Sequence, residues 1–295
     1  MRVDVVIPTT RPQGVARLLA ALDGFEGRVI VVDGNGIAPA AARNIGWRRS
    51  LAQWVCFLDD EVIPEAGWER TLRAELARAG EDVAGVQGRI VVPMPRRRRP
   101  TDWEREVGAL EGAAWATADM AYRRGALERV GGFDERLRSV SREDADLALR
   151  VMAQGMRLIR GRRRVVHPVG PAGPWVSVAR QRGTADDVLM RATHGRDWRI
   201  RARVPEGALR RHMAATVAGT VAVTLLAGGR RRPAAVAGAA WLALTAVFGA
   251  RRIAPGPRNP REVATMLATS VAIPPAAAAW WLVGHLRQRR RHRGI

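Results

Sequence analysis

The chain has 295 residues, enough for one good-sized domain with an accessory region or for two small domains. Its formal net charge is +21, yet all 49 basic residues are arginine, a bias that high-GC coding could produce. Charge alone therefore does not identify a nucleic-acid binder. The single cysteine, Cys56, excludes a disulfide framework and is typical of a small buried residue in a reducing compartment.

The first 94 residues alternate short β-rich runs with helical runs. The expected strands are "VDVVIP" (3–8), "RVIVVDG" (28–34), "QWVCFLDD" (53–60) and "VAGVQGRIVV" (83–92), and the expected helices are 14–25, 39–52 and 65–80. Continuous Val and Ile runs separated by helices indicate a largely parallel α/β sheet covered on both faces. Ligands of such sheets bind outside the carboxyl ends of the strands, where Asp33, Asp59 and Asp60 stand.

Prolines and arginines interrupt this alternation at 93–103, "PMPRRRRPTDW". The segment is either a solvated loop or a cationic segment near a phosphate-bearing ligand or lipid headgroup. Beyond it we expect a short helix ("DWEREVGALEG"), a strand ("ATADMAYRR"), a turn, a helix opened by "SREDADLALRVMAQG" and a final strand ("RRVVHP"). An amphipathic arginine-rich stretch that could lie on a membrane surface follows to about Arg211.

Three apolar stretches, 212–229, 233–250 and 263–286, contain no Asp, Glu or Arg, and each approaches the roughly 20 residues that a membrane-spanning helix needs. Residues 201–295 carry 16 arginines against two glutamates, and arginines flank the stretches as they do near anionic lipid headgroups. We therefore expect one domain at 1–200 and a membrane-associated helical region at 201–295. The alternative is three alanine-rich core helices.

The expected location is a cell membrane, crossed more than once. No signal peptide is evident at the start "MRVDVVIPTTRP", so we expect the first domain to stay in the cytoplasm. Arginines on both sides of each stretch leave the number of crossings and the side of the C-terminus open. Pro274 and Pro275 could kink the third stretch or make it re-entrant.

Three acidic residues, Asp59, Asp60 and Glu61, directly follow the third expected strand. Mg²⁺ and Mn²⁺ prefer carboxylate oxygens, and Mg²⁺ is usually held by one or two carboxylates together with a substrate's phosphates. Such a pair after a buried strand supplies this incomplete shell. Equally, the cluster could simply begin a helix, where the helix dipole favours acidic residues.

A second acidic group lies in "SREDADLALR", 141–150. Ser141 and Asp144 have the spacing of a capping box, which gives Glu143 and Asp144 a purely structural interpretation. The leucines that follow would turn inward and leave Asp144 at the exposed first turn. There its carboxylate could accept a proton from an attacking hydroxyl.

Six pieces of the chain, in order, resemble the inverting family 2 glycosyltransferases with a GT-A-type fold, over roughly residues 2–170. The pieces are "VVIPTTRP", "VVDG", "AARNIGW", "FLDDEVIP", "ADMAYRRGALERVGGFDERL" and "REDADLALRVMAQGMRL". The resemblance implies a Rossmann-like, mostly parallel sheet with helices on both faces, followed here by the C-terminal helical membrane region. It also implies a nucleotide-diphosphate sugar donor over the strand ends and a Mn²⁺ or Mg²⁺ cofactor.

The resemblance further implies roles for individual residues. The nucleotide sugar would contact Pro8, Thr9, Asp33, Arg43, Asp59 and Asp60. The metal would be held by Asp59, Glu61 and His167, although His167 could equally be a partly buried strand-end histidine. Asp144 would be the general base, and the pocket for the sugar and acceptor would include Trp115, Asp119, Arg123 and Glu143.

Three departures from the family pattern limit these assignments. Glu61 stands where the family commonly has Asp, so it is open which of the three acids binds the ion, and Gly34 replaces a second polar residue after Asp33. The "QxxRW" segment of processive polymerases is missing, which indicates transfer of one sugar or few.

The expected function is metal-assisted inverting transfer of a single sugar to a lipid, or to a lipid-linked or cell-envelope glycan, at the inner membrane face. One alternative is a polyprenyl-phosphate glycosyl synthase, which would need a basic phosphate pocket. An alternative of another class is a catalytically inert membrane scaffold that keeps the fold. We expect no nucleic-acid partner, because no aromatic platform accompanies the arginines.

Overall fold

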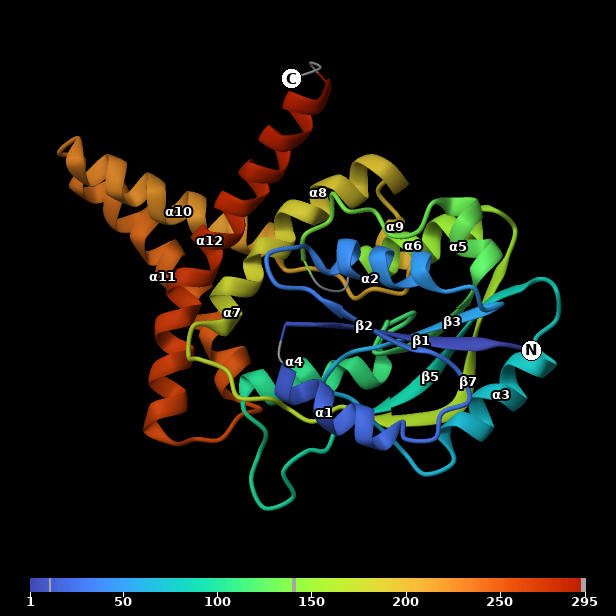
Figure 1. Cartoon of the computed structure of the whole chain (residues 1–295). Coiled ribbons are helices and arrows are strands. Elements are labelled where there is room, and N and C mark those ends of the chain that lie inside the picture. The colour runs from blue at the N-terminus through green and yellow to red at the C-terminus, as the bar shows by residue number, and fades with distance from the viewer. Residues whose placement is uncertain (11, 140–141, 293–295) are drawn as a thin grey trace. The chain divides into compact units, whose positions relative to one another are not determined.

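The computed structural model describes residues 1–10, 12–139 and 142–292 (Figure 1). The chain forms two compact units, and each unit is built from three separate stretches of the sequence. Unit 1 comprises Met1–Pro93, Val107–Gly170 and Thr193–Val204. Unit 2 comprises Met94–Glu106, Pro171–Ala192 and the chain from Pro205 onward. Two segments from the first 200 residues therefore belong to the same unit as the C-terminal helices.

Unit 1 is built on a seven-stranded sheet with the order β2-β1-β3-β6-β5-β7-β4. The strands are β1 (Val3–Thr9), β2 (Val29–Asp33), β3 (Trp54–Leu58), β4 (Ile63–Pro64), β5 (Val83–Val91), β6 (Asp119–Arg123) and β7 (Arg157–Val166). β1 pairs parallel with β2 and β3, and β5 pairs parallel with β7, whereas β6 and β4 run antiparallel to their neighbours. The predicted mostly parallel α/β sheet is confirmed, with one reversed strand at its centre.

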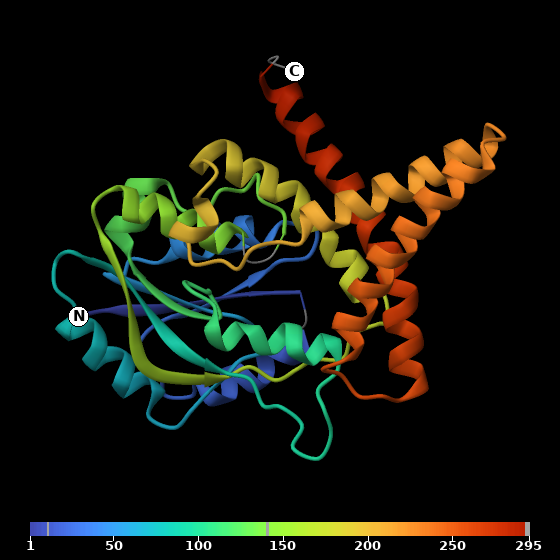
Figure 2. The ribbon, with the colours of Figure 1, turned by 180° about the vertical axis from the view of Figure 1, so that it is seen from behind.

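Helices cover both faces of this sheet (Figures 1 and 2). One face carries α2 (Pro39–Arg49), α5 (Arg124–Val130) and α6 (Arg142–Ala153), whose apolar residues share one buried core cluster with Val6, Phe57 and Tyr122. The other face carries α1 (Pro12–Ala21) and α3 (Trp68–Arg78). Strand β3 is buried along its whole length and is a continuous apolar run, as predicted. Cys56 lies inside β3 as a buried free thiol, as expected.

Close packing between α2 and β1 depends on Gly46. A Cβ atom at this position would lie only 2.2 Å from Cγ1 of Val6, so any larger residue would push the helix off the strand. The short distance between helix and sheet brings the long side chain of Arg43, one turn earlier in α2, to the carboxyl edge of the sheet. We use "carboxyl edge" for the edge at which β1, β2 and β3 end.

The remaining elements are helical. They are α4 (Asp102–Gly108), α7 (Val176–Ala179), α8 (Gly183–His194), α9 (Trp198–Arg201), α10 (Leu209–Ala227), α11 (Arg231–Ile253) and α12 (Pro260–His292), with 3₁₀ turns at Ala109–Gly112 and Arg180–Arg182. Helices thus cover all three predicted apolar stretches. Within the described residues, two helical stretches are long and apolar enough to cross a membrane, Arg231–Ile253 and Pro260–Arg290. α12 continues through Pro274 and Pro275 without a break.

Candidate active site

The carboxyl edge of the sheet gathers polar residues from three strands. Thr9 at the end of β1 pairs in register with Asp33 at the end of β2, and Asp59 and Asp60 follow β3 directly. The hydroxyl of Thr9 donates to Oδ2 of Asp60 over 2.6 Å. Asp33 accepts a hydrogen bond from the backbone N–H of Asn35, which closes the turn after β2. The structure therefore brings the residues predicted for the nucleotide side to one edge.

Arg43 joins this edge to helix α6. One amino group donates to Oδ1 of Asp59 and the other to Oε1 of Glu143, each over 3.0 Å. Burial by itself would lower the pKa of Arg43, but the charges of Asp144, Asp59 and Glu143 raise it, so the guanidinium stays charged. A buried cation with three acidic side chains around it fixes the spacing between the end of β3 and the start of α6.

The first turn of α6 holds two buried carboxyl groups, Glu143 and Asp144. Burial and the charge of Asp144 raise the pKa of Glu143 to about 8, although Arg43 acts in the opposite direction. Its Oε2 atom has no hydrogen-bond partner among the described residues, which is a poor setting for a full negative charge. Ser141, the expected helix cap, lies outside the described residues.

Thr117 holds Asp144. The backbone N–H of Thr117 donates to Oδ2 of Asp144 over 3.1 Å, and its hydroxyl donates to Oδ1 over 2.9 Å. Burial raises the pKa of Asp144, while the charge of Arg43 and the two bonds from Thr117 oppose the rise. The balance is a carboxylate that is oriented, more basic than an exposed aspartate, and only 6% exposed.

Glu61 and His167 face each other beside the carboxyl edge, with Oε1 of Glu61 3.7 Å from Nε2 of His167. The other ring nitrogen, Nδ1, lies 3.2 Å from the carbonyl oxygen of Pro168. A proton on Nδ1 would donate to that carbonyl and leave the lone pair of Nε2 directed away from it. Two donors that each lie about 2.1 Å from one ion are at most about 4.2 Å apart, so this pair fits a divalent cation.

Among the described residues, no third protein ligand joins Glu61 and His167. Asp59 is engaged by Arg43, and in the described part of the chain no three His, Cys, Asp or Glu side chains converge as a metal site. An ion held by Glu61 and His167 would therefore complete its shell with water and with a substrate's phosphates, as Mg²⁺ commonly does. The donors fit an ion that arrives with its substrate better than a permanently bound one.

Comparison with known proteins identifies the domain that carries these residues. Residues 11–131 match the profile described as Glycosyl transferase family 2. This part of the chain is a family 2 glycosyltransferase domain. The match includes Arg43, the acidic residues after β3 and Thr117, and it ends before Glu143, Asp144 and His167.

Two curated relatives are similar in sequence to just over half of this chain. Both are pre-mycofactocin glycosyltransferases of Mycobacterium tuberculosis, from strains CDC 1551 / Oshkosh and ATCC 25618 / H37Rv, each 30% identical over 194 residues. The alignment covers 53% of this chain and 40% of each relative. The chain thus spans about two fifths of the length of the curated relatives it matches.

A solved structure shares the fold of the chain that carries this family 2 glycosyltransferase domain. It is the mannosyltransferase PcManGT from Pyrobaculum calidifontis in complex with GDP-Man and Mn²⁺, with a TM-score of 0.56 and 19% identity. The superposition covers 95% of this chain and 87% of the mannosyltransferase. At this identity the likeness establishes the GT-A-type fold, which the sequence predicted.

The structure does not bring two of the predicted pocket residues to the site of the glycosyltransferase domain. Asp119 is fully buried in an ion pair with Arg163 at 2.8 Å and accepts a hydrogen bond from Nε1 of Trp68. Arg123 pairs in register with Trp54 at the opposite end of β3 and donates to backbone carbonyl groups there. Both side chains are committed to structural contacts, so we leave them out of the proposed site.

Trp115 was predicted from the sequence as a pocket residue, whereas Thr117, which bonds Asp144, was not predicted. Trp115 is a buried core residue with positive φ of 65°, and its ring nitrogen has no hydrogen-bond partner in the described structure. Its backbone N–H donates to Gln87, which fixes the segment that leads into Thr117. Thr117 itself was not predicted. Nothing in a single sequence distinguishes this threonine from any other residue near the start of a strand.

Proposed function

We propose that this chain transfers a single sugar, with inversion, from a nucleotide-diphosphate sugar to a lipid, or to a lipid-linked or cell-envelope glycan, at the inner membrane face. The supporting observation is the Arg43 bridge between Asp59 and Glu143. It ties Asp59 on the donor side to Glu143, the neighbour of Asp144, on the acceptor side. The family 2 glycosyltransferase domain supports the reaction class.

On the donor side, Pro8, Thr9, Asp33 and Asp60 would contact the nucleotide, and Arg43 would keep Asp59 oriented toward it. Glu61 and His167 would hold Mn²⁺ or Mg²⁺, which supplies positive charge beside the departing diphosphate. The related mannosyltransferase structure contains GDP-Man and Mn²⁺, which supports this combination of donor and ion. The two facing donor atoms at 3.7 Å support it independently.

On the acceptor side, Asp144 would act as the general base. It takes the proton from the acceptor hydroxyl while that oxygen bonds to the anomeric carbon, and the bond from this carbon to the diphosphate oxygen breaks. Attack opposite the leaving group inverts the anomeric configuration. The raised pKa of Asp144 and its orientation by Thr117 support this role. Glu143 and Trp115 would border the sugar.

A membrane acceptor is supported by the two helices of membrane-spanning length. It is also supported by chain connectivity, because β5 and β7 end within four residues of Pro93 and Gly170, where the chain passes into unit 2. We place the glycosyltransferase domain in the cytoplasm, where nucleotide sugars are made available. The similarity to pre-mycofactocin glycosyltransferases favours pre-mycofactocin as a second candidate acceptor.

The test is to incubate membranes that contain the full chain with a panel of radiolabelled sugar nucleotides and Mn²⁺ or Mg²⁺, with and without added pre-mycofactocin. Label is then counted in the lipid and aqueous phases and compared with the Asp144→Asn variant. We expect lipid-phase label that falls by at least about a hundredfold in the variant. Label confined to pre-mycofactocin would select the second acceptor. Label that persists in the variant would remove Asp144 as the base, and no label from any donor would favour an inert scaffold.

A further inference from the structure

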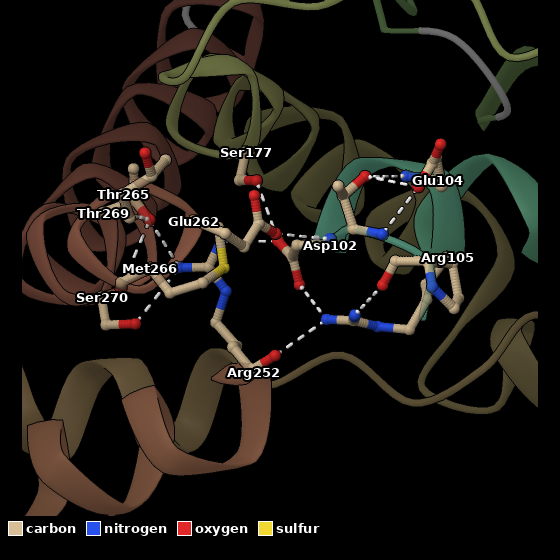
Figure 3. Close-up of polar contacts among 12 residues, drawn as sticks. Asp102, Glu104, Arg105, Ser177, Arg252, Glu262, Thr265, Met266, Thr269 and Ser270 are labelled. Atoms are coloured by element: carbon tan, nitrogen blue, oxygen red, sulfur yellow. Dashed lines mark hydrogen bonds and ion pairs between the residues drawn. The ribbon is translucent and has the colours of Figure 1, made fainter. Parts of the chain in front are cut away.

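A partly buried ion pair joins the arginine segment 94–106 to the C-terminal helices of unit 2. Asp102, the first residue of α4, accepts a hydrogen bond from Arg252 near the end of α11 over 2.6 Å, and Oγ of Ser177 lies 3.2 Å from the same carboxylate oxygen (Figure 3). Arg252 is only 9% exposed although it ends an apolar helix. A buried arginine requires such a partner, so the pair fixes the arginine segment to α11.

The same cluster includes α12. The second amino group of Arg252 donates to the hydroxyls of Thr269 over 2.7 Å and Ser270 over 3.2 Å. The backbone N–H of Asp102 donates to Glu262 in the first turn of α12. Arg105 in turn donates to the carbonyl oxygen of Arg252 (Figure 3). The start of α4 is therefore tied to the end of α11 and to the first half of α12, on both sides of the connection between them.

We call the contacts of Asp102 and Arg105 with Ser177, Arg252 and Glu262, and of Arg252 with Thr269 and Ser270, the clasp. The clasp holds the arginine segment next to the turn between α11 and α12. Arg99 donates to the carbonyl oxygen of Ala254 in that turn over 3.1 Å. The two segments 94–106 and 251–262 contain nine arginines against four carboxylates. All four carboxylates already have partners: Asp102 and Glu262 lie in the clasp, Glu104 pairs with Arg98, and Glu106 pairs with Arg180.

Nine arginines against four carboxylates leave an excess of five positive charges in these two segments. Arg96, Arg97, Arg251, Arg258 and Arg261 are exposed, and we call them the turn arginines. They stand where two helices of membrane-spanning length end and begin. At that depth a membrane presents phosphate groups, and arginine side chains beside apolar helix ends reach toward them.

We infer that the turn arginines bind the phosphate headgroups of anionic phospholipids in the leaflet where α11 ends and α12 begins. The clasp adds Arg96 and Arg97 to the three arginines that α11, α12 and the connection between them supply. This role does not depend on sugar transfer. The aromatic residue of the arginine segment, Trp103, lies under the guanidinium of Arg180, 5.7 Å from its ring centroid, and so is a poor platform for stacking a base, which favours lipid over nucleic acid.

The test uses the detergent-solubilised full chain and counts bound lipid by native mass spectrometry in an equimolar mixture of phosphatidylglycerol and phosphatidylcholine. The Arg96→Gln/Arg97→Gln variant is compared with Arg78→Gln/Arg89→Gln, which removes the same charge from exposed positions in unit 1. We expect wild type and control to prefer phosphatidylglycerol, and the segment variant to lose about fivefold in preference for each arginine removed. Equal preference in the two variants would overturn the inference.

Two further arms separate the lipid from other sources of phosphate and test the clasp. Millimolar inorganic phosphate should leave phosphatidylglycerol bound, and full displacement by it would indicate a site for free phosphate instead. Asp102→Asn should reduce the preference although every turn arginine is present, because the arginine segment is released from the turn. Thermal unfolding of this variant accompanies the measurement, and retained preference in a folded Asp102→Asn protein would refute the role of the clasp.

Discussion

Thr117 binds Asp144 through both of its donors, the backbone N–H at 3.1 Å and the hydroxyl at 2.9 Å, one to each carboxylate oxygen. The two residues are 27 positions apart, and the contact joins the segment before β6 to the first turn of α6. A carboxylate held at both oxygens has a fixed direction and a lower pKa than burial alone would give it. Thr117 is therefore a positioning residue for the proposed base.

Replacing Thr117 with valine should lower kcat about tenfold, because a hydrogen bond to a charged group contributes roughly 1.5–3 kcal/mol. It should also raise the pKa of Asp144 further, since the hydroxyl stabilises the ionised form. The acid limb of the pH profile should then move to higher pH. Thr117→Ser keeps the hydroxyl and should behave like wild type. A valine variant with an unchanged profile would show that the hydroxyl does not act on the base.

Glu143 should make the fold less stable as pH rises from about 4.5 to about 8. In this range the unfolded chain releases the proton of Glu143, whereas the native state, with a pKa of about 8, still binds it. Stability is thus greatest below the unfolded pKa and falls until the native pKa is passed. Glu143→Gln imitates the neutral form and keeps an acceptor for Arg43. Its melting temperature should exceed that of wild type above pH 7 and approach it near pH 4.5, and parallel curves would contradict the raised pKa.

Removal of divalent ions with EDTA should abolish transfer, and added Mn²⁺ should restore it. Glu61→Gln and His167→Gln should each raise the Mn²⁺ concentration for half-maximal activity by about tenfold or more. Calorimetric titration with Mn²⁺ and nucleotide gives a second measurement that does not depend on turnover. Glu65→Gln is the matched control, because Glu65 lies four residues after Glu61 and pairs with Arg164. An unchanged Mn²⁺ requirement in both ligand variants would place the ion elsewhere.

Asp119 should govern stability instead of sugar recognition. Removing one partner of a buried ion pair costs roughly 3–5 kcal/mol, so Asp119→Asn should lower the melting temperature by about 10 °C. Asp82→Asn breaks an exposed pair with Arg157 and should shift it by no more than a few degrees. If Asp119→Asn melted like wild type but had lost activity, the residue would have to be returned to the sugar pocket.

The sheet and its carboxyl edge could be predicted because both follow from local pattern. Buried Val and Ile runs fix the parallel strands, and a parallel strand brings whatever follows it, such as Asp59, to one edge. The reversed direction of β6 could not be predicted, because a five-residue run has the same alternation in either orientation. Asp119 shows the same limit. Its partner Arg163 is 44 residues away, so an acidic residue in a strand looks alike whether it faces a ligand or a buried cation.

The division of the chain shows a second limit. A composition change near residue 200 predicts a boundary there, yet segments 94–106 and 171–192 belong to the same unit as the C-terminal helices. The membership of segment 94–106 rests on Asp102 and Arg252, which are 150 residues apart, and no periodicity links such positions. Composition reports where apolar residues are concentrated, and it does not report which distant polar residues pair.

The interleaving of the two units limits how this protein can be divided for study. A chain shortened at residue 200 would look like a self-contained soluble enzyme by composition. It would keep Asp102 and Ser177 but lose Arg252, Thr269 and Ser270, and so retain half of a polar cluster whose other half had been removed. Such a fragment should be prone to self-association, and detergent extraction of the intact polypeptide is the sounder route to an active preparation.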